Sequence, residues 1–531
     1  MWSPWRHRLL RFLQFLASLI AWPYSMLYSF TIKKRAVPPI NNPLLLKKAS
    51  ELAEMIRERK ISSTTVVQAF IERIEDVNPI INSVVQDRFN DALKEAKEVD
   101  KMVEANPDPE YWLRTKPLLG VPMSFKETIA VKGMSNNGGR LRPKESIAQD
   151  DCIAVKNLRE AGAIPIVVTN TPELCFFWET YNYANGLTKN PYDTQRTAGG
   201  SSGGEASLQS AGGSPIGLGS DIAGSGRLPP MYCGIFGHKP TSRLISVTGH
   251  IPDSKDPDWN KYLVFAPIAR SASDLALVLR CAAPKETENL RLEEPVDFTT
   301  LKVYYIEECI SPLLTKVDDE IKTAVRKAAL HFQKYGIAPK KITIKDFDKS
   351  LQATLTLMLN LECPHVVFQR SEDPNDWTIW TVFGEYLRKS VGFGRVALYS
   401  IVFGLMKRYF QHLPQSQRDE CQEFKEQFTR YFEEMLGDNG VLILPVFSSP
   451  AHYHFQMYGR FLNSSYLSIF NLLEMPATAC PTGLNSKGMP IGVQIAAFKH
   501  QDRLTIGVAK ELENAYGGWV PPSSEPNHNM V

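Results

Sequence analysis

The sequence predicts an α/β protein, because short apolar runs rich in β-branched and aromatic residues occur between longer amphipathic stretches. The run at residues 164–168 follows a helical stretch that ends near Gly162, which is the pattern of a helix leading into a buried strand. Residues 303–305 and 441–445 form two similar runs. This mixture of short strands and longer helices indicates the α/β class.

The composition is that of a globular protein and excludes several classes. Hydrophobic residues make up 43% and charged residues 22% of the 531 residues, which excludes a disordered chain, a collagen and a coiled coil. The mean hydropathy of −0.21 excludes a polytopic membrane protein. The net charge is only +3 without a dense basic patch, so we expect no nucleic-acid partner. Eight cysteines without a CxxC motif, and no HExxH motif, predict neither a disulfide framework nor a bound metal.

An uncharged run at residues 12–32 predicts a membrane anchor. Its 21 residues would span about 31 Å as a helix. The alternative is a cleaved signal peptide, but the nearest small-residue candidate, at residues 17–21, has the wrong spacing for a cleavage site. We therefore expect a single-pass membrane location, such as an endomembrane or a lipid-droplet surface, with residues 1–42 forming the anchor and its linker.

Two helices are expected after this segment. The first covers residues 45–58. Ser62 and Ser63 can then cap a second helix that continues through Ile74, because a serine hydroxyl can accept a hydrogen bond from a free N–H of the first turn.

Residues 199–224 contain nine glycines, a density that indicates tight backbone turns or close approach to a ligand. A phosphate-binding loop would need a lysine after the glycines, and none follows. The start of this segment also matches GxSxG, but a nucleophile elbow requires an apolar strand just before it, and residues 190–196 are a loop. A Ser-His-Asp esterase centred on Ser201 or Ser202 stays an alternative that would need one of the ten histidines.

The stretch GGSSGGEASLQSAGGSPIGLGSDIAGSGRLP at residues 199–229 resembles the defining segment of the amidase signature family. Supporting blocks follow the expected order: LGVPMSFKE at 119–127, NPYD at 190–193, GIFGHKPT at 234–241 and PIGVQI at 490–495. The resemblance covers residues 43–519, and the branch it is most similar to is that of membrane-associated fatty-acid amide hydrolases. It implies a catalytic domain with one mixed, twisted β-sheet surrounded by α-helices, and leaves residues 520–531 as a C-terminal tail.

The resemblance also implies a Ser-cisSer-Lys catalytic group without a cofactor. Ser225 would be the nucleophile, Ser201 the bridging serine and Lys126 the base. A serine hydroxyl needs a base to take its proton, and a lysine can serve where burial keeps it neutral. The same relay run backwards protonates the departing amine, which is the difficult step in amide cleavage.

Further residues around the nucleophile follow from the resemblance. Backbone N–H groups of the loop would stabilise the tetrahedral oxyanion, and one such donor is typically worth about 10²–10³ in rate. The implied oxyanion-hole residues are Ile222, Ala223, Gly224 and Ser225, and the implied supporting residues are Ser202, Asp221 and Arg227.

Two residues depart from the family pattern. Gly226 follows the nucleophile where the family usually has an aliphatic residue, and Pro230 stands where a small residue is usual. We expect Gly226 to loosen the loop and Pro230 to stiffen it again, with consequences for the oxyanion geometry and the turnover rate.

Residues 391–410 carry a single charge before Lys407. This run predicts either a membrane-apposed helix pair that lines an acyl-chain entrance or an ordinary buried helix. Together with the resemblance, it implies a serine hydrolase that cleaves fatty-acid primary amides or N-acyl ethanolamines to a free fatty acid and an amine. The implied partners are a lipid amide and a membrane, and a homodimer is compatible with the resemblance.

Two further functions stay open beside the esterase. Another amidase of the family would act on small amides or release ammonia from glutamine for tRNA-dependent amidation, although the N-terminal anchor argues against that role. A non-catalytic receptor that keeps the fold would be expected to lose the lysine or the serines, and this chain has all three. His452 and His454 form an HxH pair without a third ligand, so we expect structural roles for them rather than metal binding.

Overall fold

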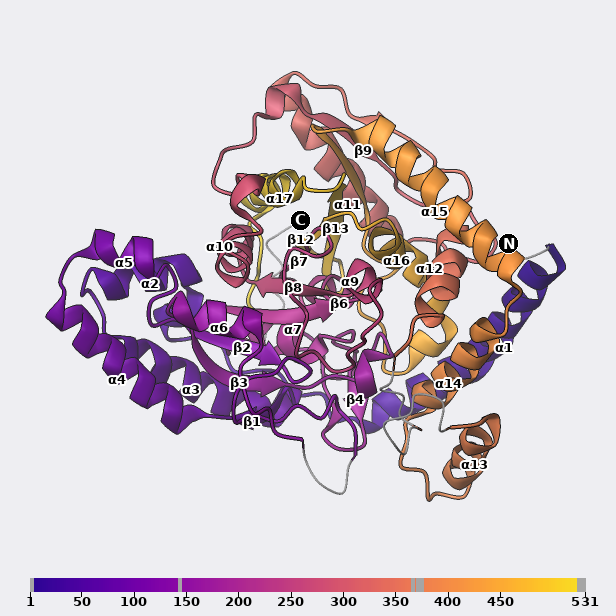
Figure 1. The fold of residues 1–531 in the computed structure, drawn as a ribbon, viewed down its shortest axis with the longest axis horizontal. Coiled ribbons are helices and arrows are strands. Elements are labelled where there is room, and N and C mark those ends of the chain that lie inside the picture. The colour runs from indigo at the N-terminus through magenta and orange to yellow at the C-terminus, as the bar shows by residue number, and fades with distance from the viewer. Residues whose placement is uncertain (1–3, 142–145, 364–367, 369–376, 523–531) are drawn as a thin grey trace.

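The computed structural model describes residues 4–141, 146–363, 368 and 377–522. Within them, one mixed sheet has the strand order β1-β3-β2-β6-β8-β7-β12-β13-β11-β9-β10, and helices lie around it (Figure 1). This is the α/β arrangement that the sequence predicts.

The strands are β1 (Val84–Asp87), β2 (Pro122–Lys126), β3 (Ile164–Thr169), β4 (Tyr181–Asn182), β5 (Gly186–Leu187), β6 (Ile216–Asp221), β7 (Phe236–Lys239), β8 (Val264–Ala269), β9 (Lys302–Tyr305), β10 (Lys340–Lys341), β11 (Gly440–Pro445), β12 (Ala477–Leu484) and β13 (Pro490–Ala497). The three predicted strands are confirmed as β3, β9 and β11. β3 and β11 are buried along their whole length, which explains why their sequences are continuous apolar runs.

The helices are α1 (Pro4–Thr31), α2 (Ala49–Arg57), α3 (Ser63–Ile81), α4 (Phe89–Ala105), α5 (Pro109–Thr115), α6 (Ile153–Glu160), α7 (Gly203–Ser210), α8 (Leu228–Tyr232), α9 (Trp259–Tyr262), α10 (Ala272–Ala282), α11 (Asp319–Leu330), α12 (Lys349–Leu359), α13 (Ile379–Ser390), α14 (Leu398–Gln411), α15 (Gln415–Leu436), α16 (Ser465–Leu472) and α17 (Asp502–Tyr516). The predicted Ser62 cap is present at α3, where the Ser62 hydroxyl accepts from the N–H of Thr65 at 3.0 Å.

The helix expected over residues 45–58 begins later than predicted. A short 3-10 helix ends at Leu46, and α2 starts at Ala49. The reason is a cap from a distant element, because the Asp274 carboxylate of α10 accepts from the N–H groups of Ala49 at 2.8 Å and Ser50 at 3.2 Å. No local pattern reveals a cap supplied by another helix.

The parallel pairing of β2 and β6 positions the candidate site. Ser124 lies opposite Gly217, and Phe125 lies opposite Leu218. Parallel neighbours end at the same edge of a sheet, so the residue that ends β2 lies beside the last residues of β6. This edge brings Lys126 next to the glycine-rich segment.

The N-terminal helix forms, but the predicted single-pass anchor is not confirmed. Among the helices of the described residues, none combines the length and the apolar character that crossing a membrane requires. α1 instead lies along the body, where the Gln14 side chain donates to the carbonyl of Gly459 at 3.2 Å. The ring of Tyr28 meets that of Phe455 edge-on, with centroids 4.8 Å apart.

The apolar run at residues 391–410 is only partly helical. α14 starts at Leu398, after a turn in which Gly392 has a φ of +84°, and α13 precedes that turn. The run therefore contributes the second helix of a pair. Of the expected tail, Val520 accepts from the Tyr192 hydroxyl, and residues 523–531 lie outside the described part of the chain.

Candidate active site

Lys126 ends β2 with its side chain fully buried. Its Nζ lies within hydrogen-bond distance of two hydroxyls, 2.6 Å from that of Ser201 and 3.0 Å from that of Ser220. Burial lowers the pKa of Lys126, because an ammonium group loses its hydration there. A lysine with a lowered pKa beside a serine hydroxyl can act as a base.

Ser201 lies in the loop before α7, and the Gly200–Ser201 peptide bond is cis. Only a glycine fits before it, because a Cβ at Gly200 would lie 2.5 Å from the backbone nitrogen of Glu179. The preceding strand, β5, ends at Leu187, well before Ser201, so no strand leads directly into the serine as it does in a nucleophile elbow.

Ser225 lies in the loop between β6 and α8 and is 4% exposed. A residue outside this loop fixes the backbone of the nearby Ala223: the indole N–H of Trp178 donates to the Ala223 carbonyl at 2.8 Å. Among the described residues, no hydrogen bond joins Ser225 to Ser201. The structure therefore brings Lys126 and Ser201 into contact, while the step to Ser225 stays a prediction.

One of the four expected oxyanion donors is engaged elsewhere. The N–H of Gly224 donates to Asp221 Oδ1 at 2.7 Å, so it is not free for a substrate oxygen. The cause is the buried carboxylate, which draws the nearest N–H of the loop toward itself. The backbone N–H groups of Ile222, Ala223 and Ser225 are the remaining candidates, and their role in binding an oxyanion stays a prediction.

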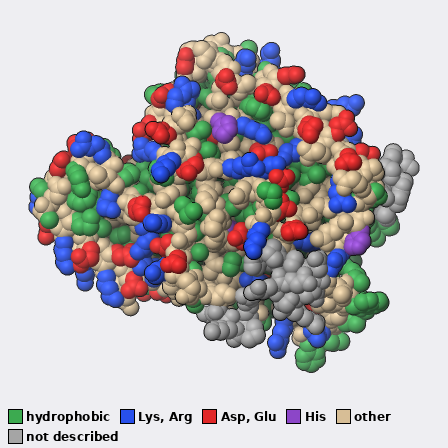
Figure 2. Space-filling view, viewed as in Figure 1, with side chains coloured by type: hydrophobic (Ala, Val, Ile, Leu, Met, Phe, Trp, Pro, Cys, Tyr) green, Lys and Arg blue, Asp and Glu red, His purple; other side chains and the backbone are tan. Residues whose placement is uncertain are grey.

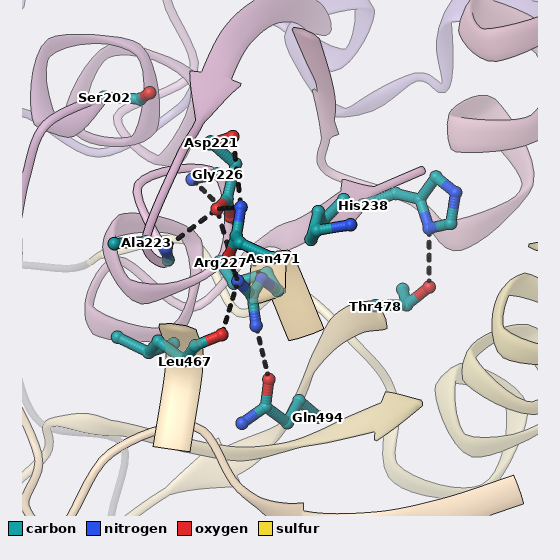
Figure 3. A network of polar contacts seen from close by, with 12 residues as sticks. Ser202, Asp221, Ala223, Gly226, Arg227, His238, Leu467, Asn471, Thr478 and Gln494 are labelled. Carbon is teal, nitrogen blue, oxygen red and sulfur yellow. Dashed lines mark hydrogen bonds and ion pairs between the residues drawn. The ribbon is translucent and has the colours of Figure 1, made fainter. Parts of the chain in front are cut away.

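Asp221 and Arg227 form a fully buried ion pair beneath this loop, with Arg227 Nε 3.0 Å from Asp221 Oδ2 (Figure 3). The guanidinium also donates to Gln494, Asn471 and the carbonyl of Leu467, at 2.8–3.0 Å. Burial alone would raise the pKa of Asp221, but the charge and hydrogen bonds of Arg227 outweigh it and lower that pKa. The pair fixes the ends of the loop that carries Ser225.

The Ser202 hydroxyl contacts the backbone of β6 rather than the side chain of Lys126. Its hydroxyl donates to the carbonyl of Ser220 at 3.2 Å and lies 3.3 Å from the N–H of the same residue. It thus holds the backbone of β6 at the residue whose side chain contacts Lys126.

The expected loosening of the loop at Gly226 is wrong. A Cβ there would lie 2.4 Å from the Cβ of Ala266 on β8, so the neighbouring strand fills the space that a side chain would take. The N–H of Gly226 also donates to Asp221 Oδ2 at 3.0 Å. Pro230 stands in the first turn of α8, where a helix tolerates proline, and it packs on Gly237.

Three side chains at this site were not found from the sequence: Ser220, His250 and Cys175. Ser220 Oγ lies 3.0 Å from His250 Nε2 as well as 3.0 Å from Lys126 Nζ. Cys175 lies close enough to Lys126 and His250 for their charges to lower the pKa of its thiol, against the effect of burial. The three residues come from separate segments and form no motif, so only their meeting in space marks them.

His452 and His454 are both buried. His454 Nδ1 lies 2.9 Å from a carboxylate oxygen of Glu179, and burial lowers the pKa of His452 to about 3. The part of the chain that the structure describes contains no group of three side chains suited to a metal ion. Within the same part, no histidine is hydrogen-bonded to Ser201, Ser202 or Ser225, the contact that a Ser-His-Asp esterase would need.

Known proteins of similar sequence and structure show which family has such a site. A family model described as "Amidase" matches residues 65–506. The chain is 37% identical to fatty-acid amide hydrolase 2-A of Danio rerio over 495 residues, which cover 92% of each protein. It is 35% identical to fatty-acid amide hydrolase 2 of Homo sapiens over 526 residues, which cover 97% of each protein.

A solved structure described as "Fatty acid amide hydrolase" has the same fold, with a TM-score of 0.71 at 23% identity, over 91% of this chain and 86% of that one. The family match covers all the strands of the large sheet and the whole candidate site. The chain therefore belongs to the amidase signature family and is a hydrolase that acts on amide bonds.

Proposed function

We propose that the chain hydrolyses fatty-acid amides through an acyl-enzyme on Ser225, with Ser201 and Lys126 as the proton relay. The observation that carries the proposal is the buried contact of 2.6 Å between Lys126 Nζ and Ser201 Oγ. Because burial lowers the pKa of Lys126, its neutral form is available at a lower pH than that of an exposed lysine. The loop that carries Ser225 supports its role by offering backbone N–H donors beside the hydroxyl.

The reaction then follows from the positions of these groups. Ser225 Oγ attacks the carbonyl carbon while its proton passes to Ser201, whose own proton passes to Lys126. The N–H groups of Ile222, Ala223 and Ser225 stabilise the oxyanion. Collapse breaks the C–N bond as the proton returns through Ser201 to the amine nitrogen. Water then attacks the acyl-enzyme through the same relay and releases the fatty acid.

A lipid amide is the substrate class that the surroundings of the loop favour. Phe176 stacks on Phe403 of α14 with centroids 3.7 Å apart, and Phe177 stacks on Tyr399 of α14 at 4.9 Å. α14 thus packs on the segment that leads to Trp178 and the oxyanion loop. Such rings can bury an acyl chain, and the two relatives carry names that specify fatty-acid amides.

A fluorophosphonate probe is expected to label Ser225, because phosphonylation needs a nucleophile beside the oxyanion donors. Peptide mapping by mass spectrometry locates the adduct. Ser225→Ala should lose the label, whereas Ser207→Ala should keep it, since the Ser207 hydroxyl on α7 donates to the carbonyl of Lys189. An adduct on Ser201 with Ser225 unlabelled would instead favour the nucleophile-elbow alternative.

We further propose that α1 and α13 associate with a membrane surface. On α1 the polar Ser25 and Ser29 are buried, whereas large apolar side chains such as Ile20, at 75% exposure, face outward. This is the reverse of a surface helix in a soluble protein. On α13, Trp380 is 76% exposed and Phe383 is also exposed. Figure 2 shows apolar side chains gathered over this helix at the lower right.

The double change Trp380→Glu/Phe383→Glu is expected to reduce co-sedimentation with phospholipid vesicles severalfold without abolishing it, because α1 still contributes. The control is Tyr111→Glu/Leu113→Glu on α5, which also carries two exposed apolar side chains and lies far from α13 (Figure 1). Equal losses for both double variants would contradict a membrane face at α13.

A further inference from the structure

His250 makes two hydrogen bonds that together determine which proton it carries. Its side chain is buried, its Nδ1 lies 2.8 Å from the carbonyl oxygen of Pro252, and its Nε2 lies 3.0 Å from Ser220 Oγ. A carbonyl can only accept, so Nδ1 must carry a hydrogen and donate it. In the neutral imidazole Nε2 is then an acceptor.

This tautomer sets the direction of the hydrogen bond from Ser220. A serine hydroxyl has one hydrogen to donate and two lone pairs that accept. Because Ser220 gives its hydrogen to His250 Nε2, it can only accept from Lys126, whose Nζ is 3.0 Å away. Ser202 holds the backbone of Ser220 on β6, so the hydroxyl stays between its two partners. Cys175 also lies near His250. Burial alone would raise the pKa of its thiol, but the nearby Lys126 and His250 outweigh burial and lower that pKa.

The direction matters because a neutral lysine has two N–H hydrogens and a single lone pair. As the proposed base, Lys126 must offer this lone pair to the hydrogen of Ser201, 2.6 Å away. A Ser220 hydroxyl free to turn could donate to the same lone pair and compete with Ser201. With its hydrogen held by His250, Ser220 instead accepts an N–H of Lys126 and turns the lone pair toward Ser201.

We propose that His250 is a positioning residue for the catalytic base: by accepting the hydrogen of Ser220, it keeps the lone pair of Lys126 free for Ser201. The inference rests on the proposed Ser225-Ser201-Lys126 function. It assigns a histidine a role in a serine hydrolase that differs from that of a general base, since His250 does not touch the reacting groups.

Two substitutions of similar polarity separate this role from a structural one. The amide of His250→Asn can take the place of Nδ1 toward Pro252 but is too short to reach Ser220. The amide of His250→Gln extends to the place of Nε2 and offers an oxygen that can accept from Ser220. We expect His250→Asn to lower kcat for a fatty amide about tenfold, and His250→Gln to keep most of the activity. If the histidine served only to hold the loop at Pro252, the order would be reversed, and that result would overturn the inference.

A second experiment measures the effect of His250→Asn in a protein that already carries Ser220→Ala. Without the competing hydroxyl, His250→Asn should have no further effect, so the two changes should be strongly non-additive. An undiminished tenfold loss in the Ser220→Ala background would show that His250 acts by another route. Lys126→Ala is measured in the same assay: if it stays active, the proposed relay itself is wrong. If Lys126→Ala is inactive while His250→Asn equals the wild type, only the role of His250 is refuted.

Discussion

Replacement of Lys126 by alanine is expected to abolish amide hydrolysis while sparing a larger share of ester hydrolysis. The variant lacks the base for attack and the acid for the leaving group, and loss of such catalysis typically costs about 10²–10⁴-fold. An amine leaves only when it is protonated, whereas an activated alkoxide or phenoxide leaves with little help. The measurement compares kcat for a fatty amide with kcat for a p-nitrophenyl ester of the same acyl chain.

The wild-type enzyme should show kcat/KM for the amide rising with pH as Lys126 loses its proton. Because burial lowers the pKa of Lys126, this rise should lie below the usual lysine value of 10.5. In Lys126→Ala the rise disappears, and the residual ester activity should climb toward high pH as hydroxide substitutes for the relay.

Lys239 offers a matched control for removing a buried lysine. It is also fully buried, and burial lowers its pKa to about 7. Within the described part of the chain, its hydrogen bonds go to the carbonyls of Pro240 and Met475. Lys239→Ala should change stability but leave the ratio of amide to ester activity in the folded enzyme unaltered. If Lys126→Ala kept amidase activity while one histidine change abolished it, a Ser-His-Asp site would replace the proposed relay.

Exchange of Asp221 for asparagine is expected to destabilise the protein by about 3–5 kcal/mol, because it leaves the buried charge of Arg227 without a partner. Gly224 and Gly226 would also lose a carboxylate acceptor, so the nucleophile loop should lose its conformation and activity should fall. Since the folded-state pKa of Asp221 is lowered, this stability is present above its usual value of 3.8 and is lost as pH falls through the folded value. Urea unfolding at several pH values measures the loss of stability and its pH dependence.

Two comparisons sharpen this experiment. The double variant Asp221→Asn/Arg227→Met should be less destabilised than the sum of the single changes, because it leaves no unpaired charge. Lys94→Met breaks the surface pair of Lys94 and Asp91, whose atoms are 3.2 Å apart, and should have little effect since water screens it. An Asp221→Asn protein as stable as the wild type would show that Arg227 is neutralised by its other partners.

The α/β class and several individual elements were predictable because their causes are local. Continuous apolar runs mark strands buried on both faces, as in β3 and β11, and the Ser62 hydroxyl caps α3 from within its own segment. The candidate residues Lys126, Ser201 and Ser225 were predicted because a fixed pattern of glycines and serines distinguishes the family. Their roles at the site stay predictions that the experiments above test.

The start of α2, by contrast, depends on the carboxylate of Asp274, which is more than 220 residues away. The role of Gly226 was misjudged because the space it leaves is filled by Ala266 of another strand. The outward apolar face of α1 was likewise hidden, since an apolar run does not reveal which of its sides meets the body.

The order of residues along the chain was thus enough to establish the α/β class, the family and the three candidate catalytic residues, because each depends on short-range pattern. Contacts between distant segments decided which groups surround the base. Ser220 reaches Lys126, with His250 and Cys175 close by, only because β2 and β6 run side by side and the loops around them fold over the same edge. Hydrogen-bond direction and burial are properties of that assembled edge, and no single segment carries them.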